Sequence, residues 1–300
     1  MSDTKKLIAV VGATGHQGGA VVRALKASGQ FKVRALTRNP AKHPLLGDEV
    51  VPADLNRPET LKAAFAGAHG IFLVTNPREP GADERKQALT AVQGAKEAGV
   101  QHFIWSTLPN VETISRGTID VPHFTNKAKV DRIVSETGFA RHTFVIAPFF
   151  YQNLIGAMGP QKQADGTLGW MLPLDPEKRV IHMGDIDELG PVVAGAFAQP
   201  DLAGNGEYLP LVGDFLSFNA IIATLNRQGH KFSFKQVPKE VFAGFFPGAK
   251  EIAEMLAYFE AHTYLGADLR EAIALANKVS GRQPTKFAAW VRTHFTIPAA

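Results

Sequence analysis

The 300-residue sequence contains no cysteine. Disulfides, thiolate catalysis and cysteine-ligated zinc sites are therefore excluded, and the composition fits a reducing compartment. The ten histidines form no H-E-x-x-H pattern, so we expect no metal site. No apolar run is long enough to span a membrane, and the first apolar segment is too short for a signal peptide. We expect a cytoplasmic protein, with a nuclear location also open.

Strong charge is also missing. The chain has 32 Lys+Arg and 28 Asp+Glu, a formal net charge of +4, and it has no arginine-rich run or basic-aromatic stripe. This charge does not indicate direct nucleic-acid binding, and we expect only a mild attraction for anionic small molecules. Apolar residues make up 45% of the sequence, which is ordinary for a globular chain with a sizeable core.

The most informative stretch is the apolar run at residues 7–11 and the turn after it, Gly-Ala-Thr-Gly-His-Gln-Gly-Gly at 12–19. Such a run is typical of a buried parallel strand. A side chain at Gly12 or Gly15 would hold a pyrophosphate away from the backbone, whereas free N–H groups at a helix N-terminus attract it. Gly18 lets the helix pack closely on the strand. The pattern follows a strand and opens a helix, so it predicts a dinucleotide site. The alternative is a plain strand–turn–helix corner.

The first half of the chain alternates between strand and helix patterns. This rhythm predicts a Rossmann-type doubly wound parallel sheet of the α/β class with right-handed crossovers. The later strands are expected at 32–37, 49–54, 70–75, 102–106 and 142–147, and the helices at 58–65, 83–98 and 122–137.

The second half is less regular. We expect a loop or short hairpin at 156–179, a helix at 185–197, a strand at 207–212, a helix at 217–227 with Ser217 as N-cap, and mostly helix after 239. We predict an NAD(P)-binding Rossmann domain at 1–153 and a smaller, mainly helical lobe for a substrate or partner at 154–300. Segments near 180–213 are expected to return to the Rossmann domain.

The end of the second strand indicates which dinucleotide is bound. An acid usually stands there and binds the adenosine ribose, but this chain has Thr-Arg-Asn-Pro-Ala-Lys at 37–42. Arg38 can fork onto a phosphate and stack on adenine, Asn39 can add a neutral hydrogen bond, and Lys42 a further charge. We therefore predict that the cofactor is NADP(H). A solvated basic turn is the alternative.

Other strand ends lie at the carboxyl edge of the sheet, where open α/β folds bind ligands. Asp54 and Leu55 are placed to meet the adenine edge, although Asp54 could also cap the next helix. Hydroxyl and amide groups at the fourth and fifth strand ends suit the middle of a dinucleotide, although such residues are also common without a ligand. These residues are Thr75, Asn76, Pro77 and Ser106.

His123 and Lys127 lie four residues apart on a predicted helix and share a face. In short-chain dehydrogenases the same helix carries Tyr-x-x-x-Lys, whose lysine holds the nicotinamide ribose. We expect Lys127 to contact the cofactor. Histidine can move protons near neutral pH, but it does not reproduce a phenol at a fixed distance from a carbonyl oxygen. The catalytic residue is left unassigned, with Lys127 and His123 as candidates.

These motifs resemble the NmrA-like family, an atypical branch of the short-chain dehydrogenase/reductase superfamily. The resemblance rests on 12–19, Thr-Arg-Asn-Pro at 37–40, Val-Thr-Asn at 74–76, His123-Phe124 with Lys127, and the segments 148–154, 187–193 and 246–249. The chain is especially similar to HSCARG-type members, which act as NADP(H) sensors. In these proteins the state of the cofactor controls the shape of the protein, its self-association and its protein partners. The fungal founder regulates a transcription factor by binding that protein and not DNA. Isoflavone-reductase-like and triphenylmethane-reductase-like relatives transfer hydride.

The residues that we expect to bind the cofactor follow from these motifs. Aromatic residues after the sixth strand can cover the nicotinamide or belong to the core. The full set is Gly12, Thr14, Gly15, His16, Gln17, Gly18, Arg38, Asn39, Lys42, Asp54, Leu55, Thr75, Asn76, Pro77, Ser106, Lys127, Phe149, Tyr151 and Asn153.

Two functions are compatible with this sequence. The resemblance implies a redox sensor and regulatory binding protein that has NADP(H) as cofactor and a protein partner such as a transcription factor. A homodimer is also open. The alternative is an NADPH-dependent oxidoreductase that acts on a quinone, an imine or a similar acceptor, which can take hydride with less need for a tyrosine acid.

Overall fold

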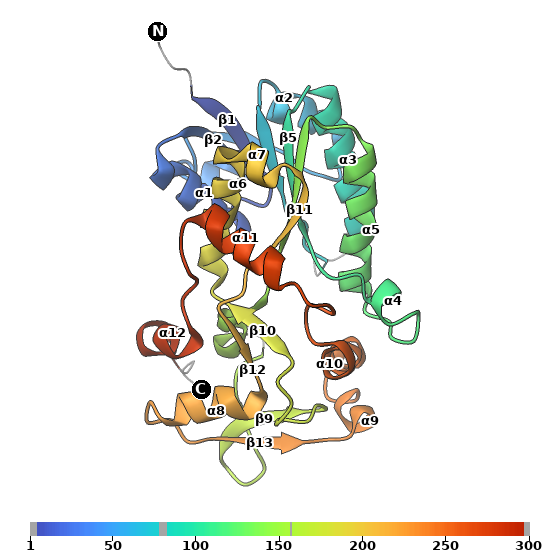
Figure 1. Cartoon of the computed structure of the whole chain (residues 1–300), viewed down its shortest axis with the longest axis vertical. Coiled ribbons are helices and arrows are strands. Elements are labelled where there is room, and N and C mark those ends of the chain that lie inside the picture. The colour runs from blue at the N-terminus through green and yellow to red at the C-terminus, as the bar shows by residue number, and fades with distance from the viewer. Residues whose placement is uncertain (1–4, 78–82, 157, 297–300) are drawn as a thin grey trace.

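The computed structural model describes residues 5–77, 83–156 and 158–296. Its upper half in Figure 1 is a seven-stranded sheet of order β11-β6-β5-β4-β1-β2-β3, in which neighbouring strands run parallel. This confirms the predicted Rossmann-type doubly wound sheet. The strands are β1 (Lys6–Val10), β2 (Phe31–Thr37), β3 (Glu49–Pro52), β4 (Gly70–Leu73), β5 (His102–Thr107), β6 (Arg141–Ile146) and β11 (Asn205–Pro210).

Helices cover both faces of this sheet (Figure 1). One face carries α1 (His16–Ser28), α6 (Leu189–Ala198) and α11 (Arg270–Ser280), and the other carries α2 (Leu61–Phe65), α3 (Glu84–Glu97) and α5 (Pro122–Glu136). With helices on both sides, the central strands are apolar throughout: Ile8, Ala9 and Val10 of β1 are fully buried.

Two glycines in α6 set how closely the first group of helices can pack. A β-carbon at Gly190 would lie 2.2 Å from the carbonyl oxygen of Ala20 in α1, and one at Gly195 would lie 2.0 Å from that of Val279 in α11. Only glycine fits at such approaches. Together with β11, α6 and α11 show that segments 189–210 and 270–280 belong to the large sheet and its helices, although they come from the second half of the chain.

The lower half in Figure 1 is built around a separate apolar core that includes Trp170, Phe218, Tyr258 and Trp290. Besides helices, it holds two three-stranded sheets, β12-β10-β7 and β13-β9-β8. The strands are β7 (Phe149–Phe150), β8 (Gln161–Lys162), β9 (Leu168–Leu172), β10 (Ile181–Gly184), β12 (Asp214–Leu216) and β13 (Phe232–Gln236). The helices are α8 (Phe218–Asn226), α9 (Lys239–Phe242), α10 (Ala249–His262) and α12 (Phe287–His294).

Short elements complete the fold. They are α4 (Val111–Ile114), α7 (Pro200–Ala203) and the 3-10 turns η1 (Pro40–Lys42), η2 (Pro58–Thr60), η3 (Tyr151–Ile155) and η4 (Ile186–Glu188). The Ser217 hydroxyl accepts from the Ala220 N–H at 3.2 Å and caps α8 as predicted. In the 156–179 segment, β8 and β9 form an antiparallel hairpin, which was one of the two expectations.

Within the described ranges, no helix is long and apolar enough to cross a bilayer. The same ranges contain no cluster of three or more histidine, aspartate or glutamate side chains that could hold a metal ion.

Candidate functional site

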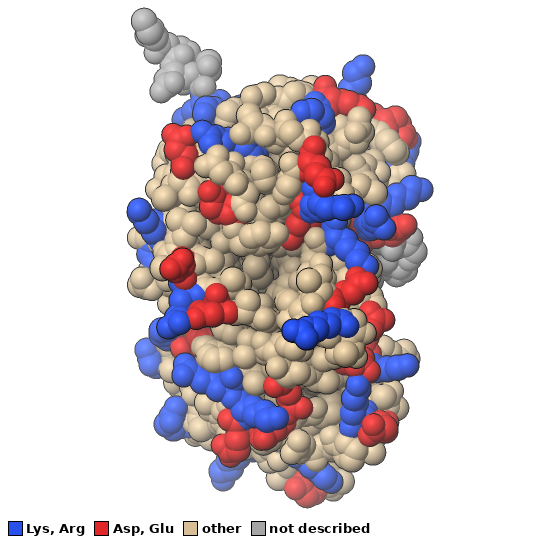
Figure 2. All heavy atoms as spheres, turned by 45° about the vertical axis from the view of Figure 1, so that its right-hand side comes forward, with Lys and Arg blue, Asp and Glu red and all other residues tan. Residues whose placement is uncertain are grey.

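A cavity of about 770 Å³ lies along the carboxyl edge of the large sheet, between the sheet and the lower lobe. Figure 2 shows a hollow at mid-height on this side of the molecule, bordered mainly by uncharged residues. The cavity is lined by the turn after β1 and by the ends of β2, β4, β5 and β6, together with residues of the lower lobe. This is the place where open α/β sheets bind ligands.

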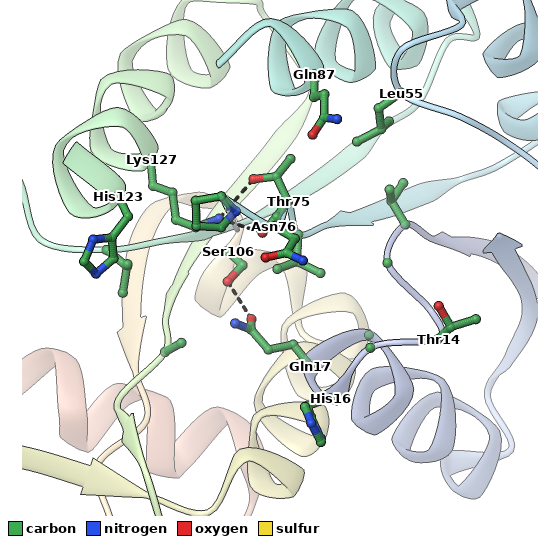
Figure 3. Close-up of a pocket in the computed structure, with 18 of the residues that line it drawn as sticks. Thr14, His16, Gln17, Leu55, Thr75, Asn76, Gln87, Ser106, His123 and Lys127 are labelled. Carbon is green, nitrogen blue, oxygen red and sulfur yellow. Dashed lines mark hydrogen bonds between the residues drawn. The ribbon is translucent and has the colours of Figure 1, made fainter. Parts of the chain in front are cut away.

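Most of the residues that the sequence singled out line this one cavity, and Figure 3 shows ten of its lining residues labelled. They are Gly12, Thr14, Gly15, His16, Gln17, Gly18, Arg38, Asn39, Asp54, Leu55, Thr75, Asn76, Pro77, Ser106, His123, Lys127, Phe149 and Asn153. Their arrival at one surface from seven separate segments supports a common ligand.

Two of the expected residues, Lys42 and Tyr151, lie away from the cavity lining. Lys42 ends η1 with an exposed side chain. Tyr151 is fully buried in the lower core, where its ring packs against Phe287 and Trp290 and its hydroxyl donates to the Thr285 carbonyl at 3.0 Å. Of the two roles considered for Tyr151, a cover for the nicotinamide or a place in the core, the structure shows the core, because the chain turns into the lower lobe directly after β7.

The glycine turn has the form that a phosphate group needs. Gly12 has φ +74°, and a β-carbon there would lie 2.7 Å from Val74 Cγ1, while one at Gly18 would lie 2.2 Å from the Gly12 carbonyl oxygen. Gly15 has φ −87°, and the nearest atom to a β-carbon would be 3.4 Å away. The fold itself therefore requires glycine at 12 and 18, whereas Gly15 leaves the exposed turn open to a ligand.

Gly15 is the N-cap of α1, and no side chain caps this helix within the described structure. The first N–H groups of a helix have no partner inside the helix, and the dipole favours negative charge at this end. His16 and Gln17 belong to this first turn and line the cavity. The turn therefore fits a pyrophosphate.

The neighbouring strand β2 is followed by Arg38, Asn39 and His43, which also line the cavity. Asp54 lies nearby, and its carboxylate accepts from the Asn56 N–H at 2.9 Å. Asp54 does not cap the helix that follows; its side chain forms an aspartate turn, which fixes the backbone beside Leu55, and both residues line the cavity. The cationic and amide groups that follow β2 fit a second phosphate.

Hydrogen bonds tie the middle of the cavity together. The Ser106 hydroxyl at the end of β5 donates to Oε1 of Gln17 in α1 at 2.7 Å (Figure 3). This bond joins the fifth strand to the glycine turn. Gln87 from α3 also lines the cavity, and its amide donates to Asn56 Oδ1 at 3.2 Å.

Lys127 points from α5 toward the end of β4 (Figure 3). Its Nζ lies 2.7 Å from Oε1 of Glu84 and donates to the Thr75 carbonyl at 3.1 Å and the Thr75 hydroxyl at 3.0 Å. The Trp105 ring lies under the ammonium, 4.9 Å from it. Burial lowers the pKa of Lys127, and the carboxylate of Glu84 acts in the opposite direction.

His123 connects the two halves of the molecule at the edge of the cavity. Its Nδ1 lies 2.5 Å from Oε1 of Glu251 in α10, and its ring stands edge-on to Phe124. Sequence reasoning missed Glu84 and Glu251. Glu84 looked like an ordinary acid in the first turn of a helix, and Glu251 lies 128 residues from its partner.

None of the four tyrosines replaces the missing phenol. Tyr264 lines the cavity, but its hydroxyl donates to the Ala147 carbonyl at 2.6 Å, and Tyr208 donates to Asp131 at 3.0 Å. Tyr151 is in the core as described, and the Tyr258 hydroxyl is buried outside the cavity lining. Burial raises the pKa of all four phenols. The site therefore has no tyrosine placed to donate a proton.

One part of the cavity wall is apolar and belongs to the core of the lower half. It is formed by Leu108, Phe124, Phe149, Met158, Met255 and Tyr264. Met158, Met255 and Tyr264 come from the lower lobe and offer an apolar surface on which a flat, apolar molecule can pack.

Comparison with known proteins places these features in a family. The family model described as the NmrA-like family matches residues 4–291. A curated NmrA-like family domain-containing oxidoreductase, hkm9 of Aspergillus hancockii, is 30% identical over 335 residues and covers 99% of both chains. An NmrA-like family domain-containing protein of Dictyostelium discoideum is 30% identical over 266 residues, covering 85% of this chain and 87% of that protein. The structure of NmrA, a negative transcriptional regulator, in complex with NADP has a TM-score of 0.82 at 25% identity, covering 98% of this chain and 96% of NmrA.

Proposed function

Because the chain belongs to the NmrA-like family, we propose that its cavity binds NADP(H) and that the bound cofactor reduces a small, largely apolar acceptor. Quinones and imines are acceptors of this kind. The oxidoreductase hkm9 and the NADP complex of NmrA support the two halves of this proposal.

In the proposed complex, the turn at Gly15 and the first turn of α1 hold the pyrophosphate. Arg38 and Asn39 hold the 2′-phosphate, and Ser106 and Lys127 lie beside the nicotinamide ribose. When bound, NADPH supplies a hydride. The residues of this chain bind and orient it and keep water from the apolar part of the cavity.

The apolar part of the cavity wall is the observation that carries the proposal. Phe149, Met255 and Tyr264 give the cavity an apolar surface on which an acceptor can pack beside the cofactor. The lack of an available tyrosine favours acceptors whose reduction does not depend on a phenol as acid.

Two measurements test this function. Calorimetric titration with NADPH, followed by NADPH consumption against a panel of quinones, imines and aldehydes, should show binding and sustained turnover. Met255→Trp fills the apolar part of the cavity and should cut turnover by about tenfold or more while NADPH affinity stays near wild type. Met171→Trp, in the same lobe but outside the cavity lining, is the matched control and should keep its turnover.

A sensor and regulatory binding protein is the second candidate. The His123–Glu251 bond favours it, because this bond joins α5 to the lower lobe across the cavity edge, where a bound cofactor could alter it. Val241, Phe245 and Phe246 also form an exposed apolar patch at α9 and the turn after it, which a protein partner could cover. Tight NADPH binding with no turnover on any acceptor would favour the sensor over the reductase.

A further inference from the structure

We propose that Glu84 is a positioning residue of the cofactor site, whose carboxylate neutralises the Lys127 ammonium and holds it against the end of β4. This inference rests on the proposed NADP(H) site. It gives a role to Glu84, which lies outside the motifs that the sequence analysis identified.

Each hydrogen of the Lys127 ammonium has an acceptor, although Glu84 Oε2 is buried without a hydrogen-bond partner among the described residues. An ammonium has three hydrogens, and Lys127 has three acceptors within 3.1 Å: Glu84 Oε1, the Thr75 carbonyl and the Thr75 hydroxyl. The hydroxyl of Thr75 donates its own hydrogen to Glu84 Oε1 at 2.6 Å. The orientation of the ammonium is therefore fixed, and so is the backbone that leads into Asn76 and Pro77, which line the cavity.

The pair is deeply buried, with 6% of each side chain exposed. Burial disfavours the charged form of a lysine, and contact with a carboxylate favours that form again. The groups that face Lys127 are Glu84 from α3, the Trp105 ring from β5 and Asp131 one turn further along α5. Glu84 acts on Lys127 through its charge and a hydrogen bond, whereas Asp131 acts through its charge alone. Burial raises the pKa of Asp131 to about 7, so above about pH 8 this carboxylate is ionised in wild type and variants alike and adds no pH dependence of its own.

Capping of α3 does not explain Glu84. The N-cap of that helix is Asp83, whose carboxylate accepts from the Lys86 N–H at 3.0 Å. Asp83 is exposed and offers a matched control, because Asp83→Asn removes the same charge one residue away without touching Lys127.

The variant test measures NADPH affinity by calorimetry between about pH 8 and pH 9.5, where the 2′-phosphate and Asp131 both stay ionised. Wild type and Asp83→Asn should show nearly constant affinity. Glu84→Gln should lose affinity as pH rises, by up to about tenfold per pH unit, because binding then requires protonation of Lys127. The double variant Glu84→Gln with Lys127→Gln should lose this pH dependence, and Glu84→Asp should restore part of the wild-type behaviour. The proposal would be overturned if Glu84→Gln lost the same amount of NADPH affinity at every pH, or lost none.

A second measurement uses the wild-type protein without cofactor. Side-chain NMR of ¹⁵N-labelled lysine, with the Lys127 signal assigned by its loss in Lys127→Gln, should show an ammonium that persists at about pH 9. A neutral Lys127 at pH 7 would overturn the proposal even if Glu84→Gln failed to fold. If no nucleotide binds, the proposed function fails, and the same NMR measurement repeated on Glu84→Gln still shows whether Glu84 keeps Lys127 protonated.

Discussion

Replacing His102 is expected to change how the stability of the protein depends on pH. His102 begins β5 and is 1% exposed, and its Nε2 lies 2.8 Å from the Thr143 hydroxyl. Burial, together with the positive charges of neighbouring residues, lowers its pKa from 6.5 to about 3. Between about pH 3 and 6.5, His102 is protonated in the unfolded chain but stays neutral in the folded chain. Stability from this group therefore falls as pH falls, by about 1.4 kcal/mol per pH unit.

Asp131 acts in the opposite direction. Burial raises its pKa from 3.8 to about 7, so between these values the folded chain keeps a proton that the unfolded chain releases. Stability from this group falls as pH rises, again by about 1.4 kcal/mol per pH unit. In the wild-type protein the opposite pH dependences of stability from His102 and Asp131 nearly cancel between about pH 4 and 6.5. A variant that lacks one of these groups should therefore show the pH dependence that the other contributes.

The assay is urea unfolding at several values between about pH 4.5 and 6.5. Relative to wild type, His102→Gln should lose about 2 kcal/mol more stability as pH rises from 5 to 6.5, and Asp131→Asn should gain about as much. His69 and His142, whose pKa values burial also lowers, remain in both variants and cancel in the comparison. If both variants followed the wild-type pH dependence, the assignment of buried, shifted groups would be refuted.

Three further substitutions test other parts of the structure. Arg38→Asp should weaken NADPH binding by about 2–3 kcal/mol and leave NADH binding nearly unchanged in calorimetry, since only NADPH carries the 2′-phosphate; equal losses for both would contradict the assignment. Thr75→Val removes a hydroxyl bonded at 2.6 Å to Glu84 and 3.0 Å to Lys127, and should cost about 2–4 kcal/mol in urea unfolding, whereas Thr75→Ser should recover most of it. Gly190→Ala should destabilise by about 1–3 kcal/mol or more, because its β-carbon would lie 2.2 Å from the Ala20 oxygen; an unchanged unfolding midpoint would show that α1 and α6 can separate freely.

The parts of the fold that the sequence predicted are those with local signals. The run at 7–11, the glycine turn and the helix after it form one continuous segment, so their pattern reports their structure directly. The strands of the lower lobe gave no such signal, because β10, β12 and β13 have only three to five residues each and gain stability from partners far along the chain.

The candidate site shows the same division. Residues at strand ends could be found because parallel strands bring their carboxyl ends to one edge. Tyr151 shows where this argument stops: it follows β7 closely but packs against Phe287 and Trp290, more than 130 residues away, and only the folded lobe reveals this. Glu251 joins the site through a similar long-range contact with His123. The choice between a reductase and a sensor stays a prediction, because both need the same cofactor residues.

Binding of NADPH at the glycine turn is the central claim, and its most direct test is a calorimetric titration of the wild-type protein beside Gly15→Leu. The fold tolerates a β-carbon at this position, since the nearest atom would be 3.4 Å away, so the variant should stay folded. We expect one NADPH per wild-type chain and a loss of affinity of at least about tenfold in the variant, because the leucine side chain holds the pyrophosphate away from the backbone N–H groups. Absence of NADPH binding to the wild-type protein, or equal affinity in a folded Gly15→Leu variant, would contradict this claim.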